Sequence, residues 1–87
     1  MGEERRWQRL RFRSWHRGTR EMDLLLGSFA DAHLAGFDAA QLDSYEALLA
    51  EGDPDLYNWI TAAAAPPERH QGAVMALLMR HRYRAGF

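Results

Sequence analysis

The chain has 87 residues, no cysteine and a formal net charge of −1, and arginine supplies every positive side chain because lysine is absent. This length allows one domain with a modest core, and the missing cysteine excludes disulfides and thiolate metal sites. No apolar run approaches the roughly 20 residues of a membrane-spanning helix, so we expect no membrane insertion.

The charges are segregated along the chain. Residues 1–20 carry seven arginines and two glutamates (+5), residues 21–68 carry ten acids and no arginine (−10), and residues 69–87 carry four arginines and no acid (+4). Either the basic ends fold back over the acidic middle and neutralise it, or the protein has a strongly dipolar surface. The sequence leaves both possibilities open.

The first predicted element ends at Arg17. Its apolar residues are interleaved with arginines, and the segment 9–15 alternates for a few positions as a strand would. A lone strand has nothing to pair with here, so we predict a helix. The apolar residues are Trp7, Leu10, Phe12 and Trp15.

A joint between two helices is predicted at residues 17–21. Arg17 would close the first helix favourably against its dipole, and Gly18 would take the left-handed position after it. Thr19 would then cap the second helix, with Glu21 and Asp23 in its first turn. Gly18 and Thr19 are what such a turn needs. Arg17 and Glu21 exceed what it needs: the residues alone favour a purely structural joint, and the alternative is a docking site that presents a guanidinium and a carboxylate beside bare backbone.

Apolar residues at helical spacing continue the second helix until Gly36. Asp38, followed by Gln41 three residues later, predicts a capping box that opens a third helix, and Gly52 ends that helix. The apolar positions of the two helices are Met22, Leu25, Leu26, Phe29, Ala30, His33, Leu34, Leu42, Tyr45, Leu48 and Leu49.

The fourth helix is predicted to start with Asp53 as its N-cap, to run into the four alanines at 62–65, and to stop before Pro66. A fifth helix follows, with Met75 and Met79 on the flank of its apolar face. The face itself comprises Ala73, Val74, Leu77, Leu78 and His81. We therefore predict one all-α domain over residues 1–87, a small bundle of about five short helices, with residues 1–6 and 83–87 fraying.

Catalytic chemistry finds no support in this sequence. The four histidines, at 16, 33, 70 and 81, are scattered without metal-ligand spacing, and no glycine-rich phosphate loop or nucleophile elbow is present. Arginines interleaved with aromatic residues favour nucleic-acid binding, whereas the ten-acid block would repel a phosphate backbone. We expect neither a metal ion nor a nucleic acid, and we rank protein binding above both.

Two short motifs resemble one known family. Arg17-Gly18-Thr19-Arg20-Glu21 and the segment DPDLYNWI at 53–60 are similar to the Arg-Gly-x-x-Glu and Asp-Pro-Asp-Leu-aromatic-Asn-Trp signatures of the FAD assembly factors, the SdhE family, at the family's spacing. The resemblance covers residues 8–82. It implies a five-helix chaperone, not an enzyme, that binds the flavoprotein subunit of succinate dehydrogenase and promotes covalent attachment of FAD to it. In some bacteria fumarate reductase is a further client.

The resemblance assigns partner-binding roles to Arg17, Gly18 and Glu21. We add His16, Asp53 and Asp55 to this candidate surface, although helix capping also accounts for the two aspartates. Tyr57 and Trp59 are assigned either to the core or to the partner, and helical spacing favours the core for Trp59.

The resemblance also implies that the chain holds no FAD stably and acts on the FAD of its partner. The first 18 residues lack a signal or transit composition, so we expect a bacterial cytoplasmic protein. The alternative function is a small regulatory binder, either antitoxin-like or a nucleic-acid-binding helical module.

Overall fold

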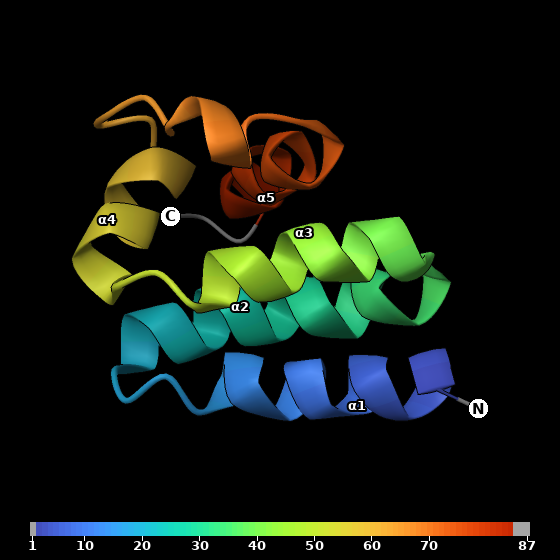
Figure 1. Cartoon of the computed structure of the whole chain (residues 1–87). Coiled ribbons are helices and arrows are strands. Elements are labelled where there is room, and N and C mark those ends of the chain that lie inside the picture. The colour runs from blue at the N-terminus through green and yellow to red at the C-terminus, as the bar shows by residue number, and fades with distance from the viewer. Residues whose placement is uncertain (1, 85–87) are drawn as a thin grey trace.

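A computed structural model describes residues 2–84, and over that range it contains helices and no strand (Figure 1). The prediction of a small all-α bundle of about five short helices is confirmed. Met1 and residues 85–87, which include parts of the predicted frayed ends, lie outside the described residues. The elements are α1 (Gly2–Trp15), α2 (Arg20–His33), α3 (Ala39–Leu49), α4 (Asp53–Ile60) and α5 (Ala73–Arg84), with the 3₁₀ turns η1 (Leu34–Gly36) and η2 (Glu68–His70).

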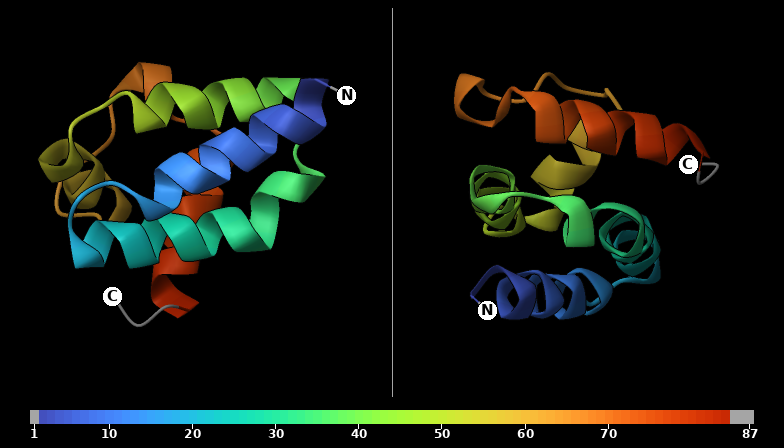
Figure 2. Two further views of the ribbon diagram at one scale, coloured as in Figure 1. Left: turned by 90° about the horizontal axis from the view of Figure 1, so that it is seen from below. Right: turned by 90° about the vertical axis from the view of Figure 1, so that its right-hand side faces the viewer.

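The helices form three layers. α2 and α3 lie side by side in the middle, α1 lies along one side of this pair, and α5 crosses its other side (Figure 2). α4 is short and stands at the end of the bundle where α3 finishes (Figure 1). The α1–α2 turn and the α3–α4 connection are thereby brought to the same end of the molecule.

The core comes from the apolar faces of all five helices, as the helical spacing predicts. One polar pair lies within it, because the hydroxyls of Ser14 and Tyr45 hydrogen-bond at 2.6 Å and both side chains are fully buried. Burial raises the pKa of Tyr45. The buried apolar residues are Leu10, Met22, Leu25, Leu26, Phe29, Ala30, Leu34, Leu42, Tyr45, Leu48, Leu49, Leu56, Trp59, Ile60, Val74, Met75 and Leu78.

Several local signals are confirmed. Thr19 caps α2 and accepts from the Met22 N–H at 3.4 Å. Asp38 and Gln41 form the reciprocal capping box at the start of α3. α2 itself ends at His33, and η1 carries the chain on to the predicted stop at residue 36. One detail differs from the prediction: Met75, predicted on the flank of the last helix, is buried in the core.

The first helix ends earlier than predicted, at Trp15 instead of Arg17. The backbone N–H of His16 bonds the carbonyl of Arg13 in a tighter turn. The N–H of Arg17 donates to the carboxylate of Asp23 at 2.6 Å and so leaves the helical ladder. A side chain of α2 therefore ends α1.

The limits of α4 also differ from the prediction. Gly52, not Asp53, occupies the N-cap position, and Asp53 is already the first helical residue. The helix stops at Ile60, and the alanines after it are not helical. Ala62 takes a positive φ of 64°, and its N–H bonds the carbonyl of Trp59. The chain turns there because η2 returns to α4, where the His70 and Trp59 rings lie 5.5 Å apart.

Candidate functional site

The two segments that resemble family signatures, residues 17–21 and 53–60, meet in space. The turn at Arg17 and Gly18 lies against the α3–α4 connection, more than thirty residues further along the chain. The contact is made by the Arg17 side chain, of which 13% is exposed. We call this region the Arg17 corner; it comprises residues 16–23 and 49–57.

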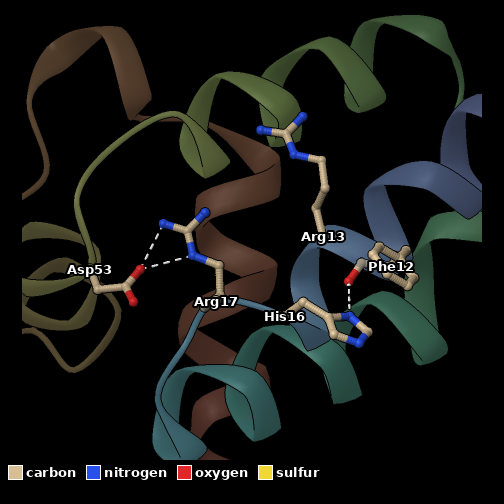
Figure 3. Close-up of a pocket in the computed structure, with 5 residues that line it drawn as sticks. All are labelled: Phe12, Arg13, His16, Arg17 and Asp53. Carbon is tan, nitrogen blue, oxygen red and sulfur yellow. Dashed lines mark hydrogen bonds and ion pairs between the residues drawn. The ribbon is translucent and has the colours of Figure 1, made fainter.

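The guanidinium of Arg17 is fully engaged within the corner. Its Nε and Nη2 lie 2.8 and 2.7 Å from Asp53 Oδ1 (Figure 3). Nη1 donates to the Leu49 carbonyl at 2.6 Å and Nη2 to the Glu51 carbonyl at 2.9 Å. These carbonyls lie at and just beyond the end of α3, where a helix leaves carbonyls without partners and carries partial negative charge. Arg17 therefore joins the end of α3 to the first residue of α4.

Asp23, in the first turn of α2, fixes the backbone of the turn at the same corner. Its Oδ1 accepts the backbone N–H of Arg17 at 2.6 Å and that of Gly18 at 3.2 Å. Sequence reasoning placed Asp23 in the first turn of α2 and missed this role. The signal is an acid four residues after an N-cap, positioned to reach back to the amides that precede the helix.

Gly18 exposes bare backbone at the corner. Its φ is +114°, a conformation that side chains with a Cβ rarely adopt, so the predicted need for glycine is confirmed. A Cβ built there would have no atom within 4 Å. The glycine is therefore required by the backbone conformation and not by close packing.

Glu21 and Asp55 project from the rim of the corner. Both are exposed, and neither makes an ion pair or side-chain hydrogen bond among residues 5–81, the part of the chain whose side chains the structure describes. Asp53 differs, because its carboxylate is 24% exposed and paired with Arg17. The capping role predicted for Asp53 is wrong, since no side chain caps α4.

Two surface pockets share Asp53. The first has a volume of about 360 Å³ and is lined by Phe12, Arg13, His16, Arg17 and Asp53 (Figure 3). The second, of about 310 Å³, lies beside Glu21. Its lining residues are Thr19, Glu21, Met22, Asp53, Pro54 and Tyr57. The Arg17 corner is thus hollowed, and an exposed aromatic residue belongs to each pocket: Phe12 is 64% and Tyr57 40% exposed.

His16 has a fixed orientation at the first pocket. Its Nδ1 lies 2.6 Å from the Phe12 carbonyl, and its ring stacks on the Phe12 ring at 4.0 Å (Figure 3). A carbonyl only accepts, so Nδ1 carries the proton and Nε2 is the acceptor in the neutral ring. Trp59, in contrast, is buried and belongs to the core, as its spacing predicts.

The other histidines lie in separate clusters. His70 is buried against Glu51, with Nε2 to Oε2 at 2.5 Å. His33 and His81 contact each other and Phe29 through their rings. Over the described residues, no three histidine or acidic side chains are grouped as metal ligands, and no helix is long and apolar enough to cross a membrane.

Comparisons with known proteins point to one family. A family model described as "Flavinator of succinate dehydrogenase" matches residues 8–82. The succinate dehydrogenase assembly factor 2, mitochondrial, of Dictyostelium discoideum is 40% identical over 74 residues, which are 85% of this chain and 52% of that protein. Assembly factor 2-A, mitochondrial, of Drosophila yakuba is 40% identical over 80 residues, 90% of this chain and 49% of that protein. The chain spans about half the length of these relatives.

These relatives correct one prediction. The expectation of a bacterial cytoplasmic protein is contradicted, because the matching proteins of Dictyostelium and Drosophila are named as mitochondrial. The prediction relied on the composition of the first 18 residues. That composition says nothing about the half of the relatives that this chain does not span.

Proposed function

Because the chain belongs to the family of succinate dehydrogenase flavinators, we propose that it is an assembly factor that binds the flavoprotein subunit of succinate dehydrogenase and promotes covalent attachment of FAD to it. The match over residues 8–82 carries this proposal, since it includes both segments of the Arg17 corner. The alternative, a small regulatory or nucleic-acid binder, has no comparable support.

The geometry of the corner supports a binding role in place of catalysis. Arg17 and Asp53 build the surface internally, with Asp23 fixing the turn. Gly18 leaves backbone bare, and the carboxylate of Glu21 projects without a partner in the described part of the chain. Preformed pockets rimmed by aromatic residues are typical of surfaces that bind other proteins.

We assign different roles to the candidate residues. Glu21, His16 and Asp55 contact the partner directly, Gly18 lets the partner approach the backbone, and Arg17 and Asp53 hold the surface in shape. Arg17 therefore acts mainly as a positioning residue, because every nitrogen of its guanidinium already binds within the chain.

The FAD belongs to the partner in this proposal. The sequence has no glycine-rich loop of the kind that binds the pyrophosphate of a dinucleotide, so the chain does not hold FAD stably. Its contribution is to bind the flavoprotein in the form in which the flavin becomes attached. The flavoprotein of fumarate reductase is a second proposed client, to be tested in parallel.

The direct test combines the purified flavoprotein subunit lacking covalent flavin, free FAD and this chain. After denaturation, fluorescence of protein-bound flavin reports covalent attachment. We expect attachment to be faster with the chain than without it, and the two proteins to copurify. Equal rates with and without the chain, together with no complex, would overturn the proposal.

A further inference from the structure

The arginines of α1 fall into two groups. Those on its flanks pair with acids of the neighbouring helices: Arg6 with Asp43 and Glu46 of α3, Arg13 also with Glu46, and Arg11 with Asp31 of α2. The basic start of the chain therefore folds over the acidic middle and neutralises part of it. This answers, for α1, the question that the segregated charges leave open.

The second group lies on what we call the outer face of α1, formed by Arg5, Arg9, Phe12 and His16. Spacings of four and three residues place Arg5, Arg9 and Phe12 on one side of the helix axis, and His16, just beyond the end of α1, stacks on the Phe12 ring. All four are exposed. Neither Arg5 nor Arg9 makes a side-chain hydrogen bond or ion pair anywhere in the part of the chain whose side chains are described.

The outer face is free and continuous with the Arg17 corner. Viewed from the α1 side, α1 lies in front of α2 and α3, so no helix covers this face (Figure 2, left). At its far end, Phe12 and His16 line the pocket that Arg17 and Asp53 complete (Figure 3). A partner seated at the corner would meet the two free arginines next.

The surroundings decide which partner fits. Carboxylates border the outer face on both sides: Asp31 on the α2 side, and Asp43 and Glu46 on the α3 side, each at least 42% exposed. Because these carboxylates are paired with Arg6 and Arg11, the positive charge of the outer face that remains without a partner is that of Arg5 and Arg9. Two cations one turn apart match the carboxylates of a short segment and offer little to a broad polyanion such as a membrane surface or a nucleic acid.

We propose that the outer face of α1 docks a short acidic segment of the flavoprotein, with carboxylates at Arg5 and Arg9 and an apolar side chain on Phe12. This inference rests on the proposed function and extends the binding surface beyond the signature residues. The two cations add attraction and orientation, which depend on salt, and the exposed ring adds apolar contact.

The test measures the dissociation constant for the purified flavoprotein subunit between 50 and 500 mM salt. Arg5→Ala with Arg9→Ala removes the two free cations. Arg80→Ala, compared with Arg9→Ala alone, is the matched control, because it removes one exposed arginine of α5 that makes no ion pair among the described residues. We expect the first pair to weaken binding about two- to thirtyfold at low salt and to flatten the salt dependence. Arg80→Ala should change neither the affinity nor its salt dependence.

Each outcome is decisive for one of the two proposals. If the unaltered chain does not bind the flavoprotein, the proposed function fails. If it binds and the Arg5/Arg9 variant matches it in affinity and salt dependence, only the present inference fails. Arg9→Glu determines the sign of the charge on the docked segment. If this variant bound the flavoprotein more tightly than the unaltered chain, the segment would be basic and the inference would be overturned. Binding of the unaltered chain to phosphatidylserine vesicles or duplex DNA, lost in the Arg5/Arg9 variant, would also overturn it if flavoprotein affinity were unchanged.

Discussion

The Arg17 guanidinium and the Asp53 carboxylate lie 2.7 Å apart, although 36 residues separate them in the chain. Each lies in one of the two segments in which the sequence resembles the family's signatures. Arg17 also donates to the Leu49 and Glu51 carbonyls, so its side chain acts as an internal brace that holds the α1–α2 turn, α3 and α4 together at this corner. We therefore expect that replacing Arg17 weakens partner binding in two ways: by changing the shape of the Arg17 corner and by removing any direct contact of Arg17 with the partner.

Replacing Arg17 with alanine should lower the free energy of unfolding by about 1.5–3 kcal/mol, because several charge-assisted hydrogen bonds are lost at a largely buried position. Arg17→Lys keeps the charge but cannot span three acceptors, so it should recover only part of this loss. Urea unfolding followed by circular dichroism gives the values. Arg9→Ala, on the free face of α1, is the control and should stay within about 0.5 kcal/mol. A similar result for Arg17→Ala would contradict the brace.

Gly18→Ala should destabilise the protein by about 1–2 kcal/mol because of its positive φ, without any steric clash. Gly36 provides the comparison, since a Cβ there also has open space and its φ lies outside the positive range. Gly36→Ala should be neutral or slightly stabilising. Thermal melts of the two variants distinguish the cases, and equal shifts would show that conformation is not the reason for Gly18.

Packing, and not backbone conformation, requires glycine at position 27. A Cβ at this position would lie 2.1 Å from the ring of Trp15, where α1 crosses α2. Gly27→Ala should therefore cost about 1–3 kcal/mol through overpacking. In a Trp15→Ala background the same change should become stabilising, because the helix gains alanine in place of glycine. A double-mutant cycle measures this coupling, and additive effects would exclude the contact.

Acid should weaken the link that Glu51 makes between the α3–α4 connection and η2. Hydrogen bonds from His70 and Arg69 lower the pKa of Glu51 in the folded protein. A carboxyl with a lowered folded pKa contributes stability above its unfolded pKa of about 4.3 and loses it as the pH falls through the folded value. The difference in free energy of unfolding between the unaltered protein and Glu51→Gln should thus be largest above pH 5 and should disappear below pH 4. Urea titrations at several pH values test this, and a constant difference would contradict it.

Signals that act over a few residues predicted the structure well. The Asp38–Gln41 capping box, the Thr19 cap and the positive φ of Gly18 each depend on neighbours within three residues. Helical spacing likewise identified the core, including Trp59. These features follow from local sequence because their partners are local.

The errors occur where distant contacts decide. The Asp23 carboxylate accepts the Arg17 N–H, and α1 is therefore shorter than predicted. The Asp53 carboxylate pairs with Arg17 and does not cap α4 as predicted. The alanine tract has high helix propensity, yet the chain turns at Ala62 to bring His70 to Trp59. The Asp23 contact has a local signal, an acid four residues after the N-cap, whereas no spacing rule contains the Arg17–Asp53 and His70–Trp59 pairings. The two segments that resemble the family signatures nevertheless supplied both members of the Arg17–Asp53 pair.

The Arg17 corner is proposed to promote flavin attachment through groups that it presents outward, and a substitution at Glu21 tests this proposal most directly. Glu21→Ala removes an exposed carboxylate without an ion pair in the described part of the chain, and Glu68→Ala removes another exposed carboxylate from η2. Both variants should match the unaltered protein in urea stability within about 0.5 kcal/mol. In the covalent flavin fluorescence assay, we predict that Glu21→Ala slows attachment about tenfold or more while Glu68→Ala does not. Unchanged attachment rates with both variants would contradict the account.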